Sequence, residues 1–153
     1  MMGPVLLASA CLCGQAVRYD GTSCLYPALT ELAETGLVVP FCPECEGGLS
    51  VPRLPAECWK GRVVRSDGTD CTAAFEEGAR RALALCRKKG CVAAVLKENS
   101  PSCGVHRVYD GSFSGRKVEG EGITARLLRS GGIRVFSEAE WEEALAFTEK
   151  FWK

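Results

Sequence analysis

The sequence predicts an α/β fold: a single domain over residues 1–153, with a mostly parallel sheet of about four strands and helices on both faces. Short apolar runs alternate along the chain with longer segments in which apolar residues recur at helical spacing. Strands that alternate with helices favour a parallel sheet. The length of 153 residues suits one domain with its own core, and 46% hydrophobic and 25% charged residues are typical of a globular protein.

The first part of the chain supplies two strands with a helix between them. Residues 5–9 form a short apolar run, which is typical of a buried strand. Pro27 suits the first position of a helix, the apolar residues after it recur at helical spacing, and Gly36 can end the helix. Residues 37–41 form the second apolar run and the second expected strand.

The middle of the chain is less regular until its longest helix. Residues 51–56 are rich in proline, which excludes a central strand, and residues 62–65 fit a short edge segment. Thr72 is expected to cap a long helix that ends at Gly90. Residues 91–96 are the third expected strand.

A long loop separates the third strand from the last elements. Residues 97–122 are rich in Gly and Ser, and a loop of this length favours a functional role. Residues 123–130 form a short helix and residues 133–136 the fourth strand. Ser137 and Glu140 have the spacing of a capping box, which predicts a final helix. We therefore expect a Rossmann-like arrangement, in which ligands bind beyond the carboxyl ends of the strands.

Ten cysteines are the most unusual feature of the composition. A secreted scaffold held by disulfides is disfavoured, because such chains are short and have small cores. No Lys or Arg precedes Arg18, so the apolar N-terminus lacks the basic part of a signal peptide. We therefore expect a cytosolic protein with reduced thiols. Cys86 and Cys91 fall at apolar positions of a helix and a strand, where core packing is expected.

Three of the cysteines follow three different expected strands. Cys11 lies just past the first strand, Cys42 ends the second, and Cys103 lies in the loop that leaves the third. Because parallel strands end at one edge of a sheet, these thiols can converge on one point. Three thiolates leave a position vacant, as in an iron–sulfur cluster with one exposed iron, whereas four sulfurs close a structural zinc site. Spacing alone leaves both kinds of site open.

Two alternative functions use the neighbouring cysteines. One is a zinc-binding structural module on Cys11, Cys13, Cys42 and Cys45. The other is a thiol oxidoreductase, since Cys42 and Cys45 form a C-x-x-C pair. The second thiol of such a pair usually lies in a helix that begins at the motif, and residues 46–48, Glu-Gly-Gly, are a poor helix start. We rank the oxidoreductase lowest for this reason.

A series of distinctive motifs follows in order along nearly the whole chain. They are Ser9-Ala10-Cys11-Leu12-x-Gly14, Arg18-Tyr19-Asp20-Gly21, Cys42-Pro43-Glu44-x-x-Gly47-Gly48-Leu49-x-x-Pro52-Arg53, Asp70-x-Thr72-x-x-Phe75-x-x-Gly78-Ala79, Lys97-Glu98-x-Ser100-Pro101-Ser102-Cys103-Gly104, Tyr109-Asp110-Gly111-Ser112-Phe113 and Gly122-Ile123-Thr124-Ala125. Together they resemble the thiouracil desulfidase family, which was long catalogued only as a domain of unknown function. Cys13 and Cys45 stand where the family's motif does not demand cysteine.

The resemblance implies a cofactor and a reaction. The cofactor is a [4Fe-4S] cluster held by Cys11, Cys42 and Cys103, which leaves one iron open to the soft sulfur of a thiocarbonyl group. The reaction is the non-redox desulfuration of a thiolated pyrimidine, such as 2-thiouracil, to uracil and sulfide. The open iron would act as a Lewis acid and make the ring carbon more electrophilic toward water.

The resemblance also implies roles for residues beside these cysteines. Glu44 matches the family's carboxylate, and we assign it acid/base work on water or on the ring nitrogen. Ser100 and Ser102 flank Cys103 and are expected to donate hydrogen bonds to the substrate or to a cluster sulfide. Tyr109 and Phe113 are candidates for stacking on a pyrimidine, with core packing as the alternative.

The charge balance indicates which kind of substrate to expect. The 19 basic and 19 acidic residues give a formal net charge of zero, so no basic surface for nucleic acid is expected. A free base or a small nucleotide is favoured over an RNA as the substrate. No apolar stretch approaches the length that spans a membrane.

Overall fold

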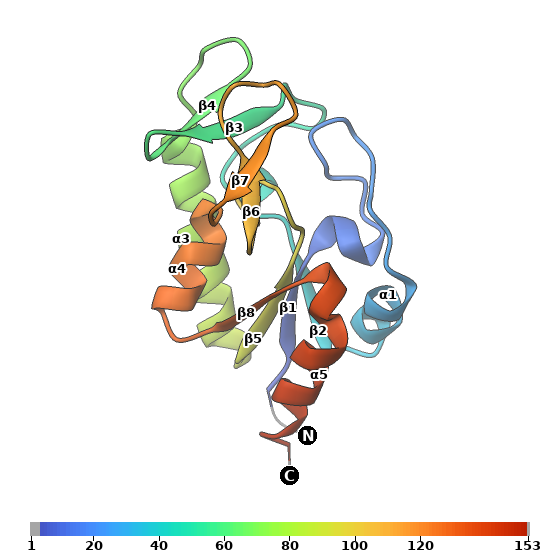
Figure 1. Ribbon diagram of the computed structural model, residues 1–153. Helices are drawn as coiled ribbons and strands as arrows, with labels where there is room; N and C mark the ends of the chain where they lie inside the picture. The colour runs from blue at the N-terminus through green and yellow to red at the C-terminus, as the bar shows by residue number, and fades with distance from the viewer. Residues whose placement is uncertain (1–3, 153) are drawn as a thin grey trace.

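The computed structural model describes residues 4–152, which form a four-stranded parallel sheet, two small antiparallel hairpins and helices on both faces of the sheet (Figure 1). The sheet has the order β2-β1-β5-β8, and each neighbouring pair is parallel. This confirms the predicted α/β fold. The strands are β1 (Leu6–Ser9), β2 (Val38–Phe41), β5 (Ala93–Leu96) and β8 (Arg134–Ser137).

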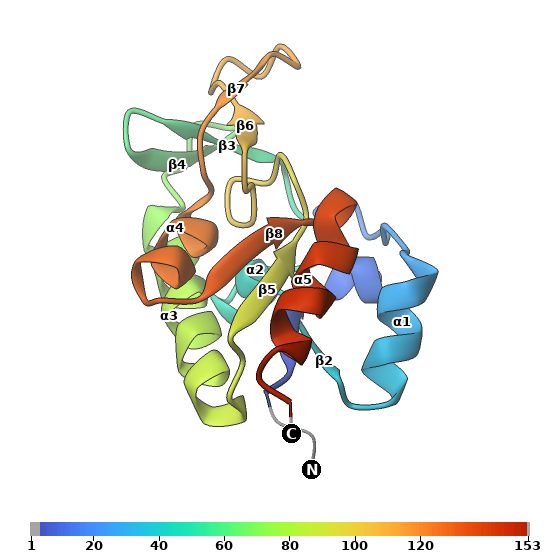
Figure 2. The same ribbon diagram turned by 60° about the horizontal axis from the view of Figure 1, so that its bottom comes forward.

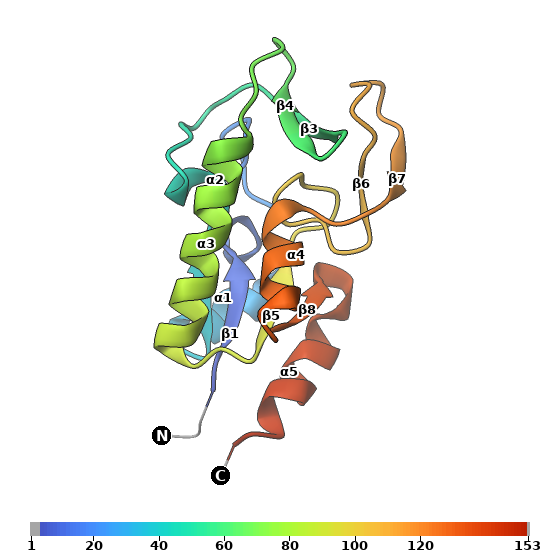
Figure 3. The same ribbon diagram turned by 90° about the vertical axis from the view of Figure 1, so that its left-hand side faces the viewer.

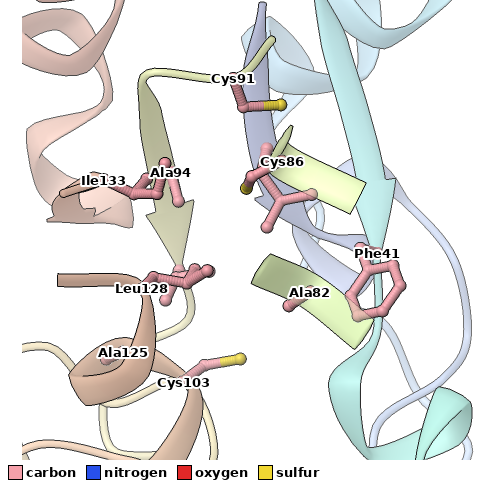
Figure 4. Close-up of a cluster of buried hydrophobic side chains, with 11 residues drawn as sticks. Phe41, Ala82, Cys86, Cys91, Ala94, Cys103, Ala125, Leu128 and Ile133 are labelled. Carbon is pink, nitrogen blue, oxygen red and sulfur yellow. The ribbon is translucent and has the colours of Figure 1, made fainter. Parts of the chain in front are cut away.

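Alternate side chains of the strands supply two cores, one on each face of the sheet. Leu7, Ala94 and Leu96 pack on one face, under α3 (Thr72–Lys89) and α4 (Ile123–Ser130). Figure 4 shows this core, in which Cys86 and Cys91 are buried as predicted. The other face packs under α1 (Pro27–Glu34) and α5 (Trp141–Glu149), which lie across the sheet from α3 and α4 in Figure 2. Its buried residues include Leu6, Ala8, Val95, Leu29 and Ala144.

The expected helices form, with small shifts at their starts. The N-cap of α3 is Cys71 rather than Thr72, whose hydroxyl instead accepts a hydrogen bond from the Val63 N–H at 2.8 Å. Thr72 is thereby used to fasten the helix start to a neighbouring strand. The capping box of Ser137 and Glu140 is present, but the turn it begins is a 3₁₀ helix, η2 (Glu138–Glu140), that leads into α5.

Two antiparallel hairpins lie outside the sheet, and of their strands only residues 62–65 were expected, as a short edge segment. Strand β3 (Ala56–Trp59) pairs with β4 (Arg62–Arg65), and β6 (Arg107–Tyr109) pairs with β7 (Lys117–Glu119) inside the long loop after β5. Both hairpins lie beyond the carboxyl ends of the sheet strands (Figure 3). Strands β3, β6 and β7 lack the continuous apolar run that marks the sheet strands, so the sequence did not reveal them.

The segment after β2 was expected to be irregular and instead forms a one-turn helix, α2 (Pro43–Glu46). Pro43 occupies its first turn, where a missing N–H costs nothing. Gly47 and Gly78 let this helix lie directly on α3, because a Cβ at Gly47 would collide with the Ala74 carbonyl and a Cβ at Gly78 with the Pro43 carbonyl. The position of α2 is therefore fixed by contact between two backbones. No helix within residues 4–152 is both long enough and apolar enough to cross a membrane.

Candidate active site

A cavity of about 410 Å³ opens beyond the carboxyl ends of β1, β2 and β5. The chain passes from β1 to β2 on one side, and the next sheet strand, β5, joins β1 on its other side. The connections leaving β1 and β5 therefore diverge, and this is the place where open α/β sheets bind ligands. The two hairpins add the outer part of the cavity wall.

The cavity brings together the three cysteines that follow the three strands. Cys11 lies in the 3₁₀ turn η1 (Ala10–Cys13) after β1, Cys42 caps α2, and Cys103 lies in the turn after β5. Cys11 and Cys103 are buried and Cys42 is half-buried. All ten cysteines are free thiols.

Burial makes these three thiols poor thiolates on their own. It raises the pKa of Cys11 to about 11 and that of Cys42 to about 12, and it also raises the pKa of Cys103, against which a hydrogen bond with Ser9 acts. A buried thiolate needs compensating positive charge, which a bound metal provides. Three soft sulfur donors, two of them buried and one half-buried, therefore face one cavity and suit an iron–sulfur centre or zinc.

The turn that carries Cys103 is held by two side-chain oxygens. The Ser100 hydroxyl accepts hydrogen bonds from the N–H groups of Ser102 and Cys103, each at 3.1 Å. Glu98 Oε1 accepts the N–H groups of Val105 at 2.7 Å, His106 at 2.9 Å, Arg107 at 3.1 Å and Asn99 at 3.3 Å. A loop without regular structure thus gains a fixed shape around the thiol.

Glu44 enters the cavity from α2 and is held from two sides. Its Oε1 accepts a hydrogen bond from Arg53 Nε at 3.2 Å, and its Oε2 accepts one from the Ser100 hydroxyl at 3.3 Å. The Arg53 side chain is only 7% exposed and also donates to the carbonyl oxygens of Ser50 and Val17. The carboxylate is therefore fixed between the Arg53 guanidinium and the Cys103 turn, while both residues remain on the cavity wall.

Ser102 faces the protein interior. Its side chain is fully buried, and its hydroxyl pairs with the Thr124 hydroxyl at 2.7 Å. The Thr124 N–H donates to the Ser102 carbonyl oxygen at 2.8 Å, and a Cβ at Gly122 would collide with the same peptide group. Ser102 therefore ties the Cys103 turn to the start of α4, whereas Ser100 faces the cavity.

The two extra cysteines lie beside the cavity rather than in its wall. Cys13 packs against the core that contains Leu12 and Leu29. The Cys45 sulfur lies 3.9 Å from both the Val17 carbonyl oxygen and Arg53 Nη1. Among residues 4–152, no group of three or more His, Cys, Asp or Glu side chains is arranged around a position for a single metal ion.

Comparison with known proteins agrees with the motifs. The profile of the 2-thiouracil desulfurase family matches residues 6–140, most of the chain. The chain belongs to this family. The solved structure of the [4Fe-4S]-dependent thiouracil desulfidase TudS superposes with a TM-score of 0.89 at 49% identity, covering 94% of this chain and 97% of TudS. The uncharacterized protein YbbK of Bacillus subtilis (strain 168) is 40% identical over 151 residues, which are 92% of this chain and 100% of YbbK.

Membership of the 2-thiouracil desulfurase family decides among the functions that cysteine spacing left open. It favours a desulfidase over the zinc-binding module and over the thiol oxidoreductase. The objection to the oxidoreductase from helix propensity was itself wrong, because Cys45 does lie in a short helix that begins at the motif. The evidence against the oxidoreductase is therefore the family match and not the helix propensity of residues 46–48.

The roles of several site residues could not be identified from the sequence. Arg53 follows two prolines within one motif, but nothing in the spacing shows that it reaches back to Glu44. Ser9 ends β1 and touches both the Lys97 N–H, at 2.9 Å, and the Cys103 thiol. Glu57 lies on the unexpected strand β3 and lines the cavity. These contacts join segments that lie far apart in the sequence, so only the fold reveals them.

Proposed function

We propose that this protein removes sulfur from a thiolated pyrimidine, with 2-thiouracil as the reference substrate, and releases uracil and sulfide. We further propose that Cys11, Cys42 and Cys103 hold a [4Fe-4S] cluster for this reaction. The observation that carries the proposal is the convergence of three free, largely buried thiols and one carboxylate on a single cavity. The similar TudS is described as a [4Fe-4S]-dependent thiouracil desulfidase, which supports the choice of cofactor and substrate.

The donor set fits the cofactor. Thiolates are the usual ligands of iron–sulfur clusters, and a cluster spreads its ligands over several irons rather than around one ion. When bound through three cysteines, such a cluster supplies an exposed iron, a Lewis acid for a soft thiocarbonyl sulfur. Cys13 and Cys45 are left outside the proposed ligand set, since neither lies in the cavity wall.

The protein's own task is to move protons. Exchange of C=S for C=O consumes one water and yields hydrogen sulfide, and the oxidation state of the ring carbon does not change. A base must take a proton from the water as its oxygen bonds to carbon, and an acid must return a proton to the departing sulfur or the ring nitrogen. We assign both steps to Glu44, the carboxylate held in the cavity wall by Arg53 and Ser100.

The cavity favours a small substrate. Its volume of about 410 Å³ lies in the range of small-molecule sites. The net charge of zero gives no electrostatic attraction to nucleic acid, so we propose a free base or a small nucleotide rather than an RNA. A cytosolic location is proposed with it, because ten free thiols are maintained most readily in a reducing compartment.

The test is an anaerobic assay on protein reconstituted with iron and sulfide. We expect uracil and sulfide to appear in equal amounts from 2-thiouracil, measured by chromatography and by a colorimetric sulfide assay. Glu44→Gln is expected to keep its iron and lose turnover, because an amide cannot accept and return the proton. Glu46→Gln, on the exposed side of the same helix, is the matched control and should remain active. Fully loaded protein that leaves 2-thiouracil unchanged would contradict the proposal.

A further inference from the structure

The turn between β6 and β7 forms part of the cavity wall. It contributes Phe113 and Gly115 to the lining, and Tyr109 precedes it at the end of β6. Figures 1 and 3 show this turn beyond the carboxyl ends of the sheet strands, beside the β3–β4 hairpin. The thiols and Glu44 come from the sheet side of the same cavity, so the turn supplies the opposite, outer boundary.

A buried carboxylate fixes the turn to β3. Glu57 is 8% exposed, and its Oε1 accepts the N–H of Gly111 at 2.9 Å and the N–H of Phe113 at 3.1 Å. Gly111 approaches β3 so closely that a Cβ there would lie 2.8 Å from both the Cys58 carbonyl oxygen and the Trp59 ring. The turn is therefore docked rather than free, and the direction of the Phe113 side chain is set by its backbone.

Phe113 has an unfavourable backbone conformation that is not compensated by burial of its side chain in a hydrophobic core. Its φ is +57°, a region that a bulky side chain rarely adopts. The residue is 39% exposed and lies outside the three buried hydrophobic clusters of residues 4–152. Backbone strain of this kind is concentrated at functional sites, where surrounding contacts enforce it. Here the enforcing contact is Glu57.

We propose that Phe113 is a specificity-determining residue, whose ring packs on the flat face of a heterocyclic substrate in the cavity. This selects planar ring thiocarbonyls over small acyclic ones, because only a ring offers a face for aromatic stacking. Glu57 is the positioning residue that holds Phe113 in place. Tyr109 is less suited to this role, since Lys117 Nζ already lies 5.7 Å from the centre of its ring. The inference rests on the proposed function for the identity of the substrate.

The decisive variant is Phe113→Gly, which removes the ring and relieves the strain at the same time. A stacking ring contacts the substrate equally in the ground state and the transition state, so its loss changes KM rather than kcat. We expect a KM for 2-thiouracil about tenfold higher, equivalent to about 1.4 kcal/mol, with kcat within about twofold of wild type. The inhibition constant of acyclic thiourea should stay within about twofold. The melting temperature should not fall, since glycine adopts this φ without cost.

Further variants distinguish the contribution of the Phe113 ring from that of Glu57, which holds it in place. Val118→Ala removes an exposed apolar side chain from the same hairpin outside the cavity wall, and it should leave KM unchanged. Glu57→Ala should reproduce the higher KM of Phe113→Gly. Glu57→Gln should restore the wild-type value, because its amide oxygen can still accept both N–H groups.

The dissociation constant of 2-thiouracil, measured by anaerobic calorimetry, separates this inference from the proposed function. A Phe113→Gly variant with unchanged KM and dissociation constant would overturn the inference, even if wild type is an active desulfidase. A variant with weaker binding but a lowered melting temperature and less bound iron would also overturn it, since Phe113 would then be structural. If wild type binds 2-thiouracil without converting it, the proposed function fails and the binding constants still decide the role of Phe113. If it does not bind at all, both fail.

Discussion

Replacing Glu98 by Gln should loosen the turn that carries Cys103. One oxygen of Glu98 accepts four backbone N–H groups, at 2.7, 2.9, 3.1 and 3.3 Å. A hydrogen bond to a charged acceptor contributes roughly 1 kcal/mol more than one to a neutral acceptor. Glutamine keeps a carbonyl oxygen but loses the charge. Because Glu98 is partly exposed, we expect the free energy of unfolding to fall by about 2 kcal/mol rather than by the full sum.

The loss of unfolding free energy in Glu98→Gln should depend on pH. Burial alone would raise the pKa of Glu98, but the N–H groups of Arg107, His106, Val105 and Asn99 together lower it below its usual range. A carboxyl group with a depressed pKa in the folded state stabilises the fold above its unfolded pKa, about 4.3. This contribution is lost as the pH falls through the folded pKa. The difference between wild type and Glu98→Gln should therefore be complete at pH 7 and should shrink below about pH 4.

Thermal unfolding of the apoprotein under reducing conditions measures this effect. For a domain of this size, about 2 kcal/mol corresponds to a melting temperature about 4–8 °C lower. Glu31→Gln, on the exposed surface of α1, is the control and should shift the melting temperature by less than 1 °C, roughly the limit for surface substitutions. A Glu98→Gln variant as stable as this control, or a difference that does not diminish in acid, would refute the account of the turn.

Three further substitutions test how Glu44 is placed. Gly78→Ala puts a methyl group against the Pro43 peptide, 2.7 Å from its carbonyl carbon. It should lower the free energy of unfolding by about 1–3 kcal/mol, measured by calorimetry, and reduce the iron content after reconstitution. Full iron content would contradict the close packing of α2. Arg53→Met should retain iron but lower kcat about 10- to 100-fold, because Glu44 loses the partner that orients it. Arg53→Lys should recover kcat only in part, since an ammonium lacks the planar fork of guanidinium, and full recovery would show that charge alone suffices.

The sheet and its helices could be predicted because their patterns are local. Apolar runs marked each of the four strands, and Pro27, Gly36 and Gly90 marked helix ends that the structure confirms. Residues 62–65 were expected as an edge segment, but β3, β6 and β7 escaped prediction because they lack a continuous apolar run. Helix α2 escaped because Gly47 and Gly48 were interpreted as a poor helix start. Gly47, together with Gly78 of α3, instead allows the two helices to touch.

The candidate site also contains residues that local patterns predict and residues whose roles depend on contacts distant in sequence. Cysteines at strand ends could be found from the sequence, since the order of strands and helices implies where the carboxyl ends meet. The orientation of Ser102 could not, because it depends on the buried hydroxyl of Thr124 from a later helix. The same holds for Arg53, whose partner Glu44 lies across a segment that contains two glycines and Pro52.

The central claim is that Cys11, Cys42 and Cys103 together hold one [4Fe-4S] cluster. Its most direct test is the iron and sulfide content per chain after anaerobic reconstitution, compared between Cys103→Ala and Cys45→Ala. We predict about four irons and four sulfides per chain for wild type and Cys45→Ala, as expected for a [4Fe-4S] cluster, and a colourless protein for Cys103→Ala. A Cys103→Ala variant that assembles the full cluster, with a Cys45→Ala variant that does not, would contradict the ligand set.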